Sequence, residues 1–572
     1  MICLKPVIRL RFLLVCILLC WSSLKGYSQQ IPVFITPVDT PVHLAGTFGE
    51  LRASHFHTGL DFRTGGTEGK SVCAAAGGWV SRVKVSTIGF GKVVYVDHPE
   101  GFTTVYAHLH HFSGPLDVYV DSAQQANRNY EVELFPDSGR FKFLSGELIG
   151  ISGNTGGSEG PHLHFEIRKQ KDQIPVNPLM YLSLEDSIVP LIEQLIIYEY
   201  KDKYYEQVKL LTLKNEAPRP AITITTKTLP DTISFGAKMN DEDPPNRLGI
   251  YEACMQADDV ELFRFSFDSL NFDDGRYANA HSVLPRMNTR FHRLHRLPGN
   301  KAASFKSVGT GWLVLNDTLP HFCQITTRDF SGNADSIGFW VSLQFDTESQ
   351  KGLMTSNPRE FTERYKYDIA NIITEKRSGA VLNIPAGALY QDMFINFLTE
   401  GSFKLTISKA VELKAKEEVP LHRAALLSLP YFPDSVKGIG KEKIILVRRD
   451  RMGKVAEVIR PDSISDKLSV SRIRNWGSYM LAIDTMSPEI VTWQTLLDSV
   501  DRKIYEVVTL KDDLSGISKV NVTVNGNWNL SVFDPRDKSL KWEIDPRAIC
   551  PCESTLDVTD PAGNHAAYRL LH

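Results

Sequence analysis

The stretch Gly160-Pro161-His162-Leu163-His164-Phe165-Glu166-Ile167 decides the fold of the early part of the chain. It is an apolar, strand-forming run, and two histidines spaced by one residue on a β-strand project from the same face. A face with two imidazoles can hold a metal ion. Upstream, Phe56-His57-Thr58-Gly59-Leu60-Asp61 carries a histidine and a carboxylate four residues apart, and Val105-Tyr106-Ala107-His108-Leu109 carries another histidine in an apolar strand. Together the three stretches predict one site built from short strands.

Short strands punctuated by glycine surround these motifs between about residues 30 and 182. Residues 79–85, 91–97 and 102–106 show alternation or β-branching, with almost no helical periodicity. This pattern predicts a mainly β chain that begins with an antiparallel sheet domain. The histidines are expected on that sheet.

The order of the motifs resembles that of the lysostaphin-type (LytM) zinc metallopeptidases. The resemblance rests on Gly46-Thr47-Phe48-Gly49-Glu50-Leu51-Arg52, on His57-Thr58-Gly59-Leu60-Asp61, on Tyr106-Ala107-His108-Leu109, and on Gly153-Asn154-Thr155-Gly156 followed by His162-Leu163-His164-Phe165-Glu166. Pro175-Val176-Asn177-Pro178 is similar to the end of that domain. The resemblance covers roughly a quarter of the chain and implies a LytM-like zinc peptidase domain over residues 29–185.

A catalytic zinc ion takes three protein ligands and keeps one open position, with nitrogen and carboxylate oxygen as suitable donors. His57, Asp61 and one of the pair His162 and His164 supply that set, and spacing alone leaves open which of the pair binds. The resemblance assigns His164 to a single Zn²⁺ per chain and makes His162 the general base, which takes a proton from activated water. By the same resemblance, His108 stabilises or protonates the tetrahedral intermediate.

Each of these residues has an ordinary structural alternative, because a single histidine in a strand is more often a hydrogen-bonding residue than a ligand. Gly59, between His57 and Asp61, can simply mark a bulge or a turn. The joint occurrence of the motifs in one order favours a metal site. Five other histidines match no required position and are interpreted as surface or neighbouring residues: His43, His55, His98, His110 and His111.

The first residues have the pattern of a secretory signal peptide. Basic residues precede an apolar run at residues 12–21 that is too short to span a bilayer. Gly26 and Ser28 are the small residues that a signal peptidase requires, so residues 1–28 are expected to be removed. We therefore expect export to the periplasm or cell envelope, or out of the cell, with no membrane span after cleavage. An uncleaved membrane anchor is the alternative.

Composition limits the other classes of function. The chain has 572 residues, 42% of them hydrophobic and 23% charged, which predicts three or four ordinary globular domains. A formal net charge of −3 gives no reason to expect nucleic acid, and no basic run indicates an anionic membrane surface. The cysteines beyond the signal are too scattered for a disulfide framework, and Cys550-Pro551-Cys552 has no second pair that would complete a zinc site. We expect buried thiols with at most one bridge.

Two segments are expected to border the site. Gly153-Asn154-Thr155-Gly156-Gly157-Ser158 lacks the ending of a P-loop and is interpreted as a wall of the substrate groove. Between His111 and Gly146 the chain departs from the family pattern, and residues 117–120 and 130–135 predict a hairpin inserted at about 112–146. Such an insertion leaves the metal ligands intact but affects substrate preference.

The rest of the chain predicts accessory β domains. After a helix-like segment at 187–194, we expect a β-sandwich over 186–348, a β-rich domain over 358–487 and an immunoglobulin-like β-sandwich over 488–572. These regions pair no histidine with a carboxylate, and the acidic run Asn240-Asp241-Glu242-Asp243 lacks the spacing of an EF-hand. Their expected role is positioning, through binding of wall polymer or of an envelope protein partner.

These observations predict a secreted zinc metalloendopeptidase that hydrolyses peptide bonds in bacterial peptidoglycan cross-links or stem peptides. Two other classes of protein remain open. One is a catalytically silent LytM-like module that binds the wall or activates another hydrolase. The other is an envelope assembly or adhesion protein in which the C-terminal β domains are the working part.

Overall fold

The structure is a computed structural model of the chain. It describes residues 34–201, 204–212, 224–226, 231–286, 289–307, 309–345, 363–401, 406–417, 419–544 and 553–571. The expected signal segment and the pair Cys550 and Cys552 lie outside the described residues. Cys73, Cys254 and Cys323 are free thiols. No helix in the ranges just given has the length and the apolar character that a membrane crossing requires.

A nine-stranded antiparallel sheet forms the centre of the first region, which confirms the predicted mainly β, antiparallel architecture. The strand order is β1-β2-β11-β6-β5-β4-β8, with β9 beside β4 and β12 beside β11, and a smaller sheet has the order β3-β10-β7. The elements of this region are β1 Leu44–Gly46, β2 Leu60–Arg63, β3 Ser71–Cys73, β4 Gly78–Val85, β5 Val93–Asp97, β6 Phe102–Ala107, β7 Leu109–Phe112, α2 Gly114–Asn127, β8 Val132–Leu134, β9 Lys142–Phe143, β10 Leu148–Ser152, β11 His162–Lys169 and β12 Pro175–Val176.

Strand β11 lies between β2 and β6, and its register places the site. His164 is directly opposite Asp61 on β2 and opposite Ala107 on β6. Side chains of directly opposed residues share one face of the sheet, with Cβ atoms about 4.5–5.5 Å apart. The register therefore brings His164 and Asp61 together although 103 residues separate them in sequence.

The hairpin expected at 112–146 is wrong. Helix α2, Gly114–Asn127, occupies the first part of this segment, and β8 and β9 each pair with β4 rather than with one another. The buried residues of α2 are Leu116, Val120 and Gln124. A spacing of four residues places all three on one face of a helix, which covers the core. The inserted segment therefore extends the edge of the main sheet.

The second region packs directly on the first, and one hydrophobic core runs through both. Phe267 of the second region packs against Phe56, with ring centroids 5.3 Å apart. The helix-like segment expected at 187–194 is wrong, because β13 begins at Leu191 and pairs with β16. The elements are β13 Leu191–Lys201, β14 Tyr204–Thr212, β15 Ile224–Thr226, β16 Asp231–Asp243, β17 Asn246–Leu248, β18 Glu252–Ala257, β19 Val260–Ser266, α3 Ala278–His281, β20 Ser282–Arg286, β21 Thr289–Arg293, β22 Leu313–Leu315, β23 His321–Arg328, β24 Ala334–Val341 and β25 Leu343–Phe345.

The third and fourth regions each consist of two antiparallel sheets with a hydrophobic core of their own. The sheets of the third region have the orders β26-β29-β30-β36-β32-β33 and β27-β28-β31-β35-β34, and those of the fourth have the orders β37-β38-β42-β41 and β40-β39-β43-β44. The strands of the third region are β26 Arg364–Tyr365, β27 Asn371–Thr374, β28 Val381–Ile384, β29 Met393–Thr399, β30 Val411–Ala415, β31 Ala425–Pro430, β32 Ile444–Arg449, β33 Val455–Ile459, β34 Ser463–Ile464, β35 Leu468–Ile473 and β36 Gly477–Ile483. Those of the fourth are β37 Glu489–Leu497, β38 Ile504–Lys511, β39 Lys519–Val524, β40 Asn527–Asn529, β41 Ser531–Asp534, β42 Ser539–Ile544, β43 Glu553–Thr559 and β44 His565–Leu571.

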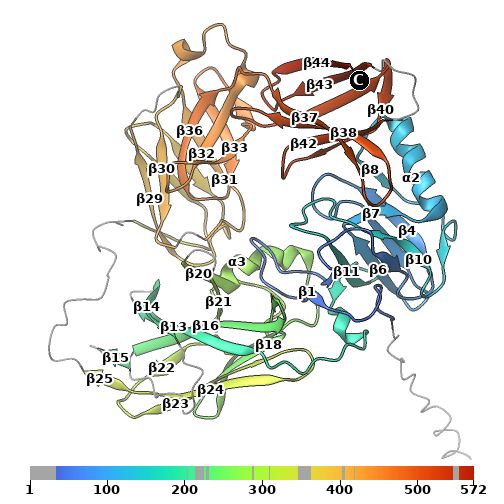
Figure 1. The fold of residues 1–572 in the computed structure, drawn as a ribbon. Helices are drawn as coiled ribbons and strands as arrows, with labels where there is room; N and C mark the ends of the chain where they lie inside the picture. The colour runs from blue at the N-terminus through green and yellow to red at the C-terminus, as the bar shows by residue number, and fades with distance from the viewer. Residues whose placement is uncertain are drawn as a thin grey trace, which may run out of the picture.

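The four regions follow one another around a ring, so that the last region, in red, lies beside α2 and β8 of the first, in blue (Figure 1). The second and third regions meet where Tyr390 donates a hydrogen bond to the carbonyl of Arg276 at 2.8 Å. The third and fourth share a small apolar cluster. The fourth returns to the first through Arg536, whose Nη1 donates to Asn154 Oδ1 at 3.2 Å.

Candidate metal centre

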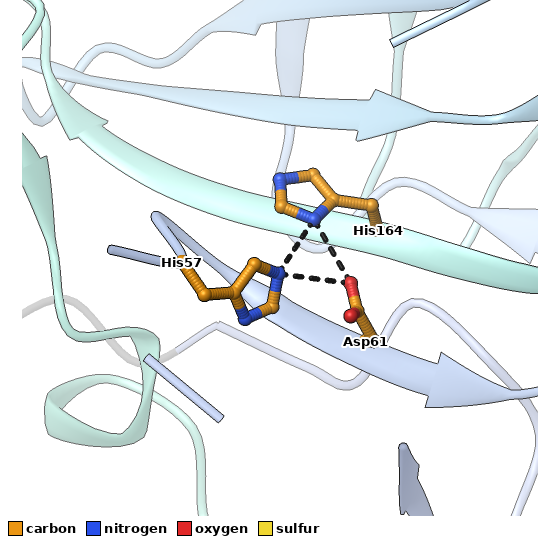
Figure 2. Close-up of side chains that lie close together, drawn as sticks. All are labelled: His57, Asp61 and His164. Atoms are coloured by element: carbon orange, nitrogen blue, oxygen red, sulfur yellow. Dashed lines mark hydrogen bonds and ion pairs between the residues drawn. The ribbon is translucent and has the colours of Figure 1, made fainter. Parts of the chain in front are cut away.

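Three buried side chains of the first region converge on one point (Figure 2). His57 precedes β2, Asp61 lies on β2, and His164 lies on β11. His57 Nε2 lies 3.0 Å from Asp61 Oδ1 and 3.0 Å from His164 Nδ1, and the latter atom lies 2.9 Å from Asp61 Oδ1. Of the pair that spacing left open, the structure places His164 in this triangle.

The hydrogen bonds of the two imidazoles show which nitrogens carry protons. His57 Nδ1 donates to the carbonyl of Thr47 at 2.8 Å, and His164 Nε2 donates to Glu166 Oε1 at 3.0 Å. In neutral rings the other nitrogens are therefore unprotonated, and they face each other and the carboxylate of Asp61 as lone-pair donors. Three such atoms fit a bound cation in the place of any proton they share, and two nitrogens with one oxygen suit Zn²⁺.

The charges of the cluster also favour a bound positive charge. Burial lowers the pKa of His164, but hydrogen bonds to Asp61 and Glu166 outweigh burial and raise this pKa to about 9. For Asp61, burial raises the pKa, while His57 and the other neighbouring histidines hold it well below its usual range. The cluster thus retains a proton when no cation neutralises it, and a metal ion must displace that proton in order to bind.

Glu166, on the same strand as His164, fixes the orientation of that imidazole. Its carboxylate is completely buried and also accepts hydrogen bonds from Thr58 Oγ1 and Arg168 Nε. Burial raises the pKa of Glu166, but Arg168, His164 and Thr58 lower it to about 2, so the group is ionised. A carboxylate that holds the outer nitrogen of a metal-binding histidine is typical of zinc sites.

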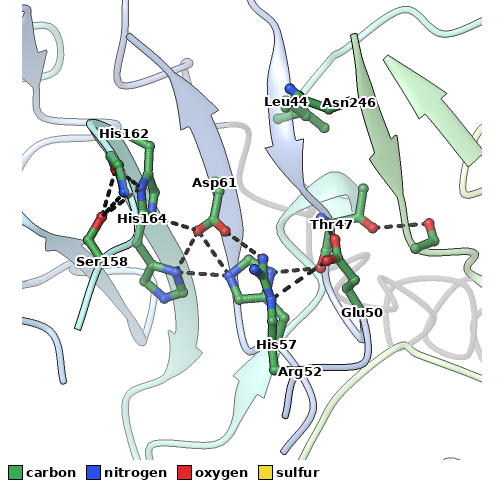
Figure 3. A network of polar contacts seen from close by, with 12 residues as sticks. Leu44, Thr47, Glu50, Arg52, His57, Asp61, Ser158, His162, His164 and Asn246 are labelled. Carbon is green, nitrogen blue, oxygen red and sulfur yellow. Dashed lines mark hydrogen bonds and ion pairs between the residues drawn. The ribbon is translucent and has the colours of Figure 1, made fainter. Parts of the chain in front are cut away.

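The second oxygen of Asp61 is occupied by Arg52, as the polar network in Figure 3 shows. Arg52 Nη2 donates to Asp61 Oδ2 at 2.6 Å, which leaves Oδ1 for a metal. Gly46 lies against this pair, because a Cβ atom there would be 2.7 Å from Asp61 Oδ2 and closer still to Arg52. The glycine therefore leaves room for the arginine that orients Asp61.

Gly59 is also explained by close approach. A Cβ atom on Gly59 would meet the carbonyl oxygen of Phe165 and lie 2.9 Å from Glu166 Cγ and 3.0 Å from His164 Cε1. Any side chain here would push the segment that carries His57 away from β11. The glycine thus does more than mark a turn.

The two remaining predicted site residues lie beside the triangle. His162 Nδ1 donates to the carbonyl of Gly160 at 2.8 Å, and its Nε2 lies 3.5 Å from Asp61 Oδ1. His108 Nδ1 donates to the carbonyl of Thr155 at 2.8 Å, and its ring centroid lies 4.8 Å from that of His162. The structure therefore brings all five predicted side chains together, and in both of these imidazoles Nδ1 donates to a backbone carbonyl.

His108 has the features of a functional residue. Its φ of 60° lies in the left-handed region, which is uncommon for residues other than glycine and occurs at functional sites. Burial, with the neighbouring histidines, lowers its pKa to about 3, so the ring is neutral near pH 7. Thr155, its acceptor, belongs to the loop at 153–158, which we call the wall loop. That loop fixes the orientation of His108.

Sequence reasoning assigned no role to Thr47, Arg52 and Glu166. The alternation of β11 offered a signal for Glu166, because residues two apart on a strand share a face and Glu166 follows His164 by two. Arg52 and Thr47 reach Asp61 and His57 only through the fold of the 46–57 segment, and no local pattern predicts those contacts.

Comparison with known proteins places this site in a family. A family model described as peptidase family M23 matches residues 55–128, which include His57, Asp61 and His108. The chain contains a family M23 peptidase domain. A second model, the Zu5-like domain, matches residues 362–484 in the third region.

The chain is also similar to curated relatives. It is 35% identical over 160 residues to the DD-carboxypeptidase/endopeptidase Mpg of Neisseria meningitidis serogroup B, covering 27% of this chain and 29% of that protein. It is 36% identical over 110 residues to an uncharacterized metalloprotease of Haemophilus influenzae, covering 19% and 18%. The catalytic domain of lysostaphin from Staphylococcus simulans is 21% identical, with 24% of this chain and 87% of that domain covered and a TM-score of 0.17. The match spans less than a third of either curated relative.

Proposed function

We propose that this protein is a zinc metalloendopeptidase that hydrolyses peptide bonds in the cross-links or stem peptides of bacterial peptidoglycan. The observation that carries the proposal is the convergence of His57 Nε2, Asp61 Oδ1 and His164 Nδ1 within 3.0 Å of one another. Two further imidazoles, each with Nδ1 held by a backbone carbonyl, lie beside this triangle. The peptidase name of the Neisseria relative supports a peptide substrate.

In the proposed site, His57, Asp61 and His164 hold one Zn²⁺. Zinc supplies a Lewis acid that polarises a carbonyl and lowers the pKa of water to about 7. Arg52 keeps Asp61 bound through one oxygen, and Glu166 keeps His164 turned with Nδ1 towards the ion. These positioning residues hold the ligands in place before substrate arrives.

His162 is the proposed general base. Its Nδ1 proton is engaged by the Gly160 carbonyl, so Nε2 is free to accept the proton of the attacking water. That proton must return to the amine nitrogen when the peptide bond breaks. His108 lies beside His162 and is the proposed residue that stabilises the intermediate or relays this same proton, received at its Nε2, to the leaving amine.

The remaining parts of the proposal concern location and partners. Residues 1–28 direct export to the periplasm or cell envelope, or out of the cell. The substrate is the peptide part of peptidoglycan, and the C-terminal β regions position the M23 domain on wall polymer or on an envelope protein.

The direct test is muropeptide release from purified sacculi by zinc-loaded chain 29–572. His108→Ala and His162→Ala are expected to lower release by about 10²-fold or more, because each removes a proton-transfer group. His55→Ala is the matched control, since His55 is an exposed histidine outside the site, and it should release muropeptides at the wild-type rate. Equal release by all four proteins would overturn the proposal.

A second candidate function, a silent or regulated M23 module, has one observation in its favour. Arg536 of the fourth region donates to the carbonyl of Ser158 and to Asn154 Oδ1, so this region sits on the wall loop next to His162. A wild-type chain that binds zinc yet releases nothing, together with release by Arg536→Ala, would favour this candidate.

A further inference from the structure

A second cluster of metal-binding side chains lies where the fourth region meets the first. His110 is on β7, and Asp498 and Asp501 are in the turn between β37 and β38. His110 Nε2 lies 3.8 Å from Asp498 Oδ1 and 3.9 Å from Asp501 Oδ2. The ligand atoms all lie within 4.8 Å of one another. Sequence reasoning placed His110 on the surface or near the first site, yet its side chain is only 11% exposed.

The orientation of His110 follows from its other partner. Glu68 Oε2 lies 2.7 Å from His110 Nδ1 and accepts its hydrogen bond. The other ring nitrogen, Nε2, faces two carboxylate oxygens. Distances of 3.8 and 3.9 Å are too long for hydrogen bonds, so the two carboxylates and Nε2 are paired only as charges and leave space between them.

The two aspartates are oriented by contacts of their own. Asp498 Oδ1 accepts the backbone N–H of Val500 at 2.8 Å, and Asp501 Oδ2 accepts the hydroxyl of Tyr505 at 2.9 Å. In metal sites, supporting hydrogen bonds of this kind orient the side chains that bind the ion. The aspartates are 17% and 20% exposed, so they are largely shielded from water at the junction.

The nearby lysines direct their hydrogen bonds to other groups. Lys92 Nζ donates to the carbonyl of His110 at 2.9 Å, and Lys503 Nζ pairs with Glu543 at 2.6 Å. Two carboxylates and an imidazole nitrogen thus face one another, while Lys503 acts on Asp501 only through its charge. Zinc ligands at about 2.0–2.2 Å can lie up to about 4 Å apart around one ion, which accommodates the observed spacing.

We propose that His110, Asp498 and Asp501 bind a second Zn²⁺ that ties the fourth region to the M23 domain. Three protein ligands would leave one position for water. The ion would lie beside the contact between Arg536 and the wall loop, so its binding holds the fourth region against the loop that orients His108. The proposal does not depend on hydrolysis, because the first site uses other ligands.

Metal content tests the proposal. The chain is equilibrated with zinc, dialysed, and analysed for zinc per chain by mass spectrometry. Wild type is expected to hold two ions, His110→Gln one ion, and the double variant His57→Ala/His164→Ala one ion. His111→Gln is the matched control, a neighbouring histidine on the same strand, and should hold two. Equal zinc per chain in wild type and His110→Gln would overturn the proposal.

A second measurement keeps the test valid if one of these variants misfolds. In the His57→Ala/His164→Ala background, zinc should slow hydrogen–deuterium exchange in residues 498–503 and in the wall loop. Adding Asp498→Asn and Asp501→Asn to this background should abolish that protection. Zinc that changes exchange equally with and without the aspartates, or changes nothing, would contradict a bridging ion. If wild type and His57→Ala/His164→Ala each hold one ion and His110→Gln holds none, the first site is empty. That result would count against the proposed peptidase function and leave the second site supported.

Discussion

Replacing Glu166 with glutamine tests whether a buried carboxylate holds the metal ligand. Glutamine keeps the size of the side chain but removes its charge, so His164 loses the ionised acceptor at Nε2. Arg168, which pairs with the same carboxylate and is itself buried, loses its counter-charge. One substitution therefore affects both the orientation of the ligand and the stability of the M23 domain.

The expected magnitudes differ for the two effects. Removing an outer carboxylate from a metal-bound histidine typically lowers metal affinity by about 10–100-fold. Breaking a buried ion pair by removing one partner costs about 3–5 kcal/mol of stability, because the remaining charge stays buried. Glu166 is 0% exposed, so little of this loss is relieved by solvent.

The assay is competition for zinc with a chromophoric chelator, combined with urea unfolding of the metal-free protein. Glu100→Gln is the matched control, because Glu100 is exposed at a turn beyond the sheet. The control should bind zinc and unfold like wild type. Zinc affinity of Glu166→Gln within twofold of wild type would refute the assigned role in holding His164. A stability loss without an affinity loss would show that Glu166 serves the fold alone.

Two further predictions follow from buried groups. Gly46→Ala should weaken zinc binding, because the added Cβ would lie 2.7 Å from Asp61 Oδ2. Gly160→Ala is the control, since there is open space around Gly160, and it should bind zinc like wild type. Competition with a chelator measures the zinc affinity of both variants. In the second region, burial lowers the pKa of His292 to about 3 and that of His281 well below its usual range. Below about pH 6.5 the unfolded chain therefore binds two protons that the folded chain does not, and the free energy of unfolding should fall by up to about 2.7 kcal/mol per pH unit. Urea unfolding at pH 8, 6 and 5 measures this slope, and a stability that rises as the pH falls would contradict it.

The sequence was most informative where function depends on local alternation. His162, His164 and Glu166 share a face because β11 is a strand, and that follows from the apolar run alone. The pairing of β11 with β2 was not predictable in the same way, since register between strands far apart in sequence depends on the whole sheet. The orientation of Asp61 by Arg52 depends on that register and became visible only in the structure.

The segment after β7 shows why the hairpin prediction failed. Val118, Tyr119 and Val120 favour a strand by intrinsic preference, and this preference guided the prediction. Pro115 near the helix start and the buried residues Leu116 and Val120, four apart, belong to α2 instead. Burial of one helical face against the first region outweighed local propensity, as tertiary contacts often do.

The ring of four regions has a consequence for how the molecule is made. Arg536 and its partner Asn154 are 382 residues apart in sequence. Domains fold as units while the ribosome is still adding residues. The M23 domain can therefore complete its strands long before its last neighbour is synthesised, and it spends that interval with an uncovered wall loop. Any restraint that the fourth region places on the site begins only after that region has been synthesised.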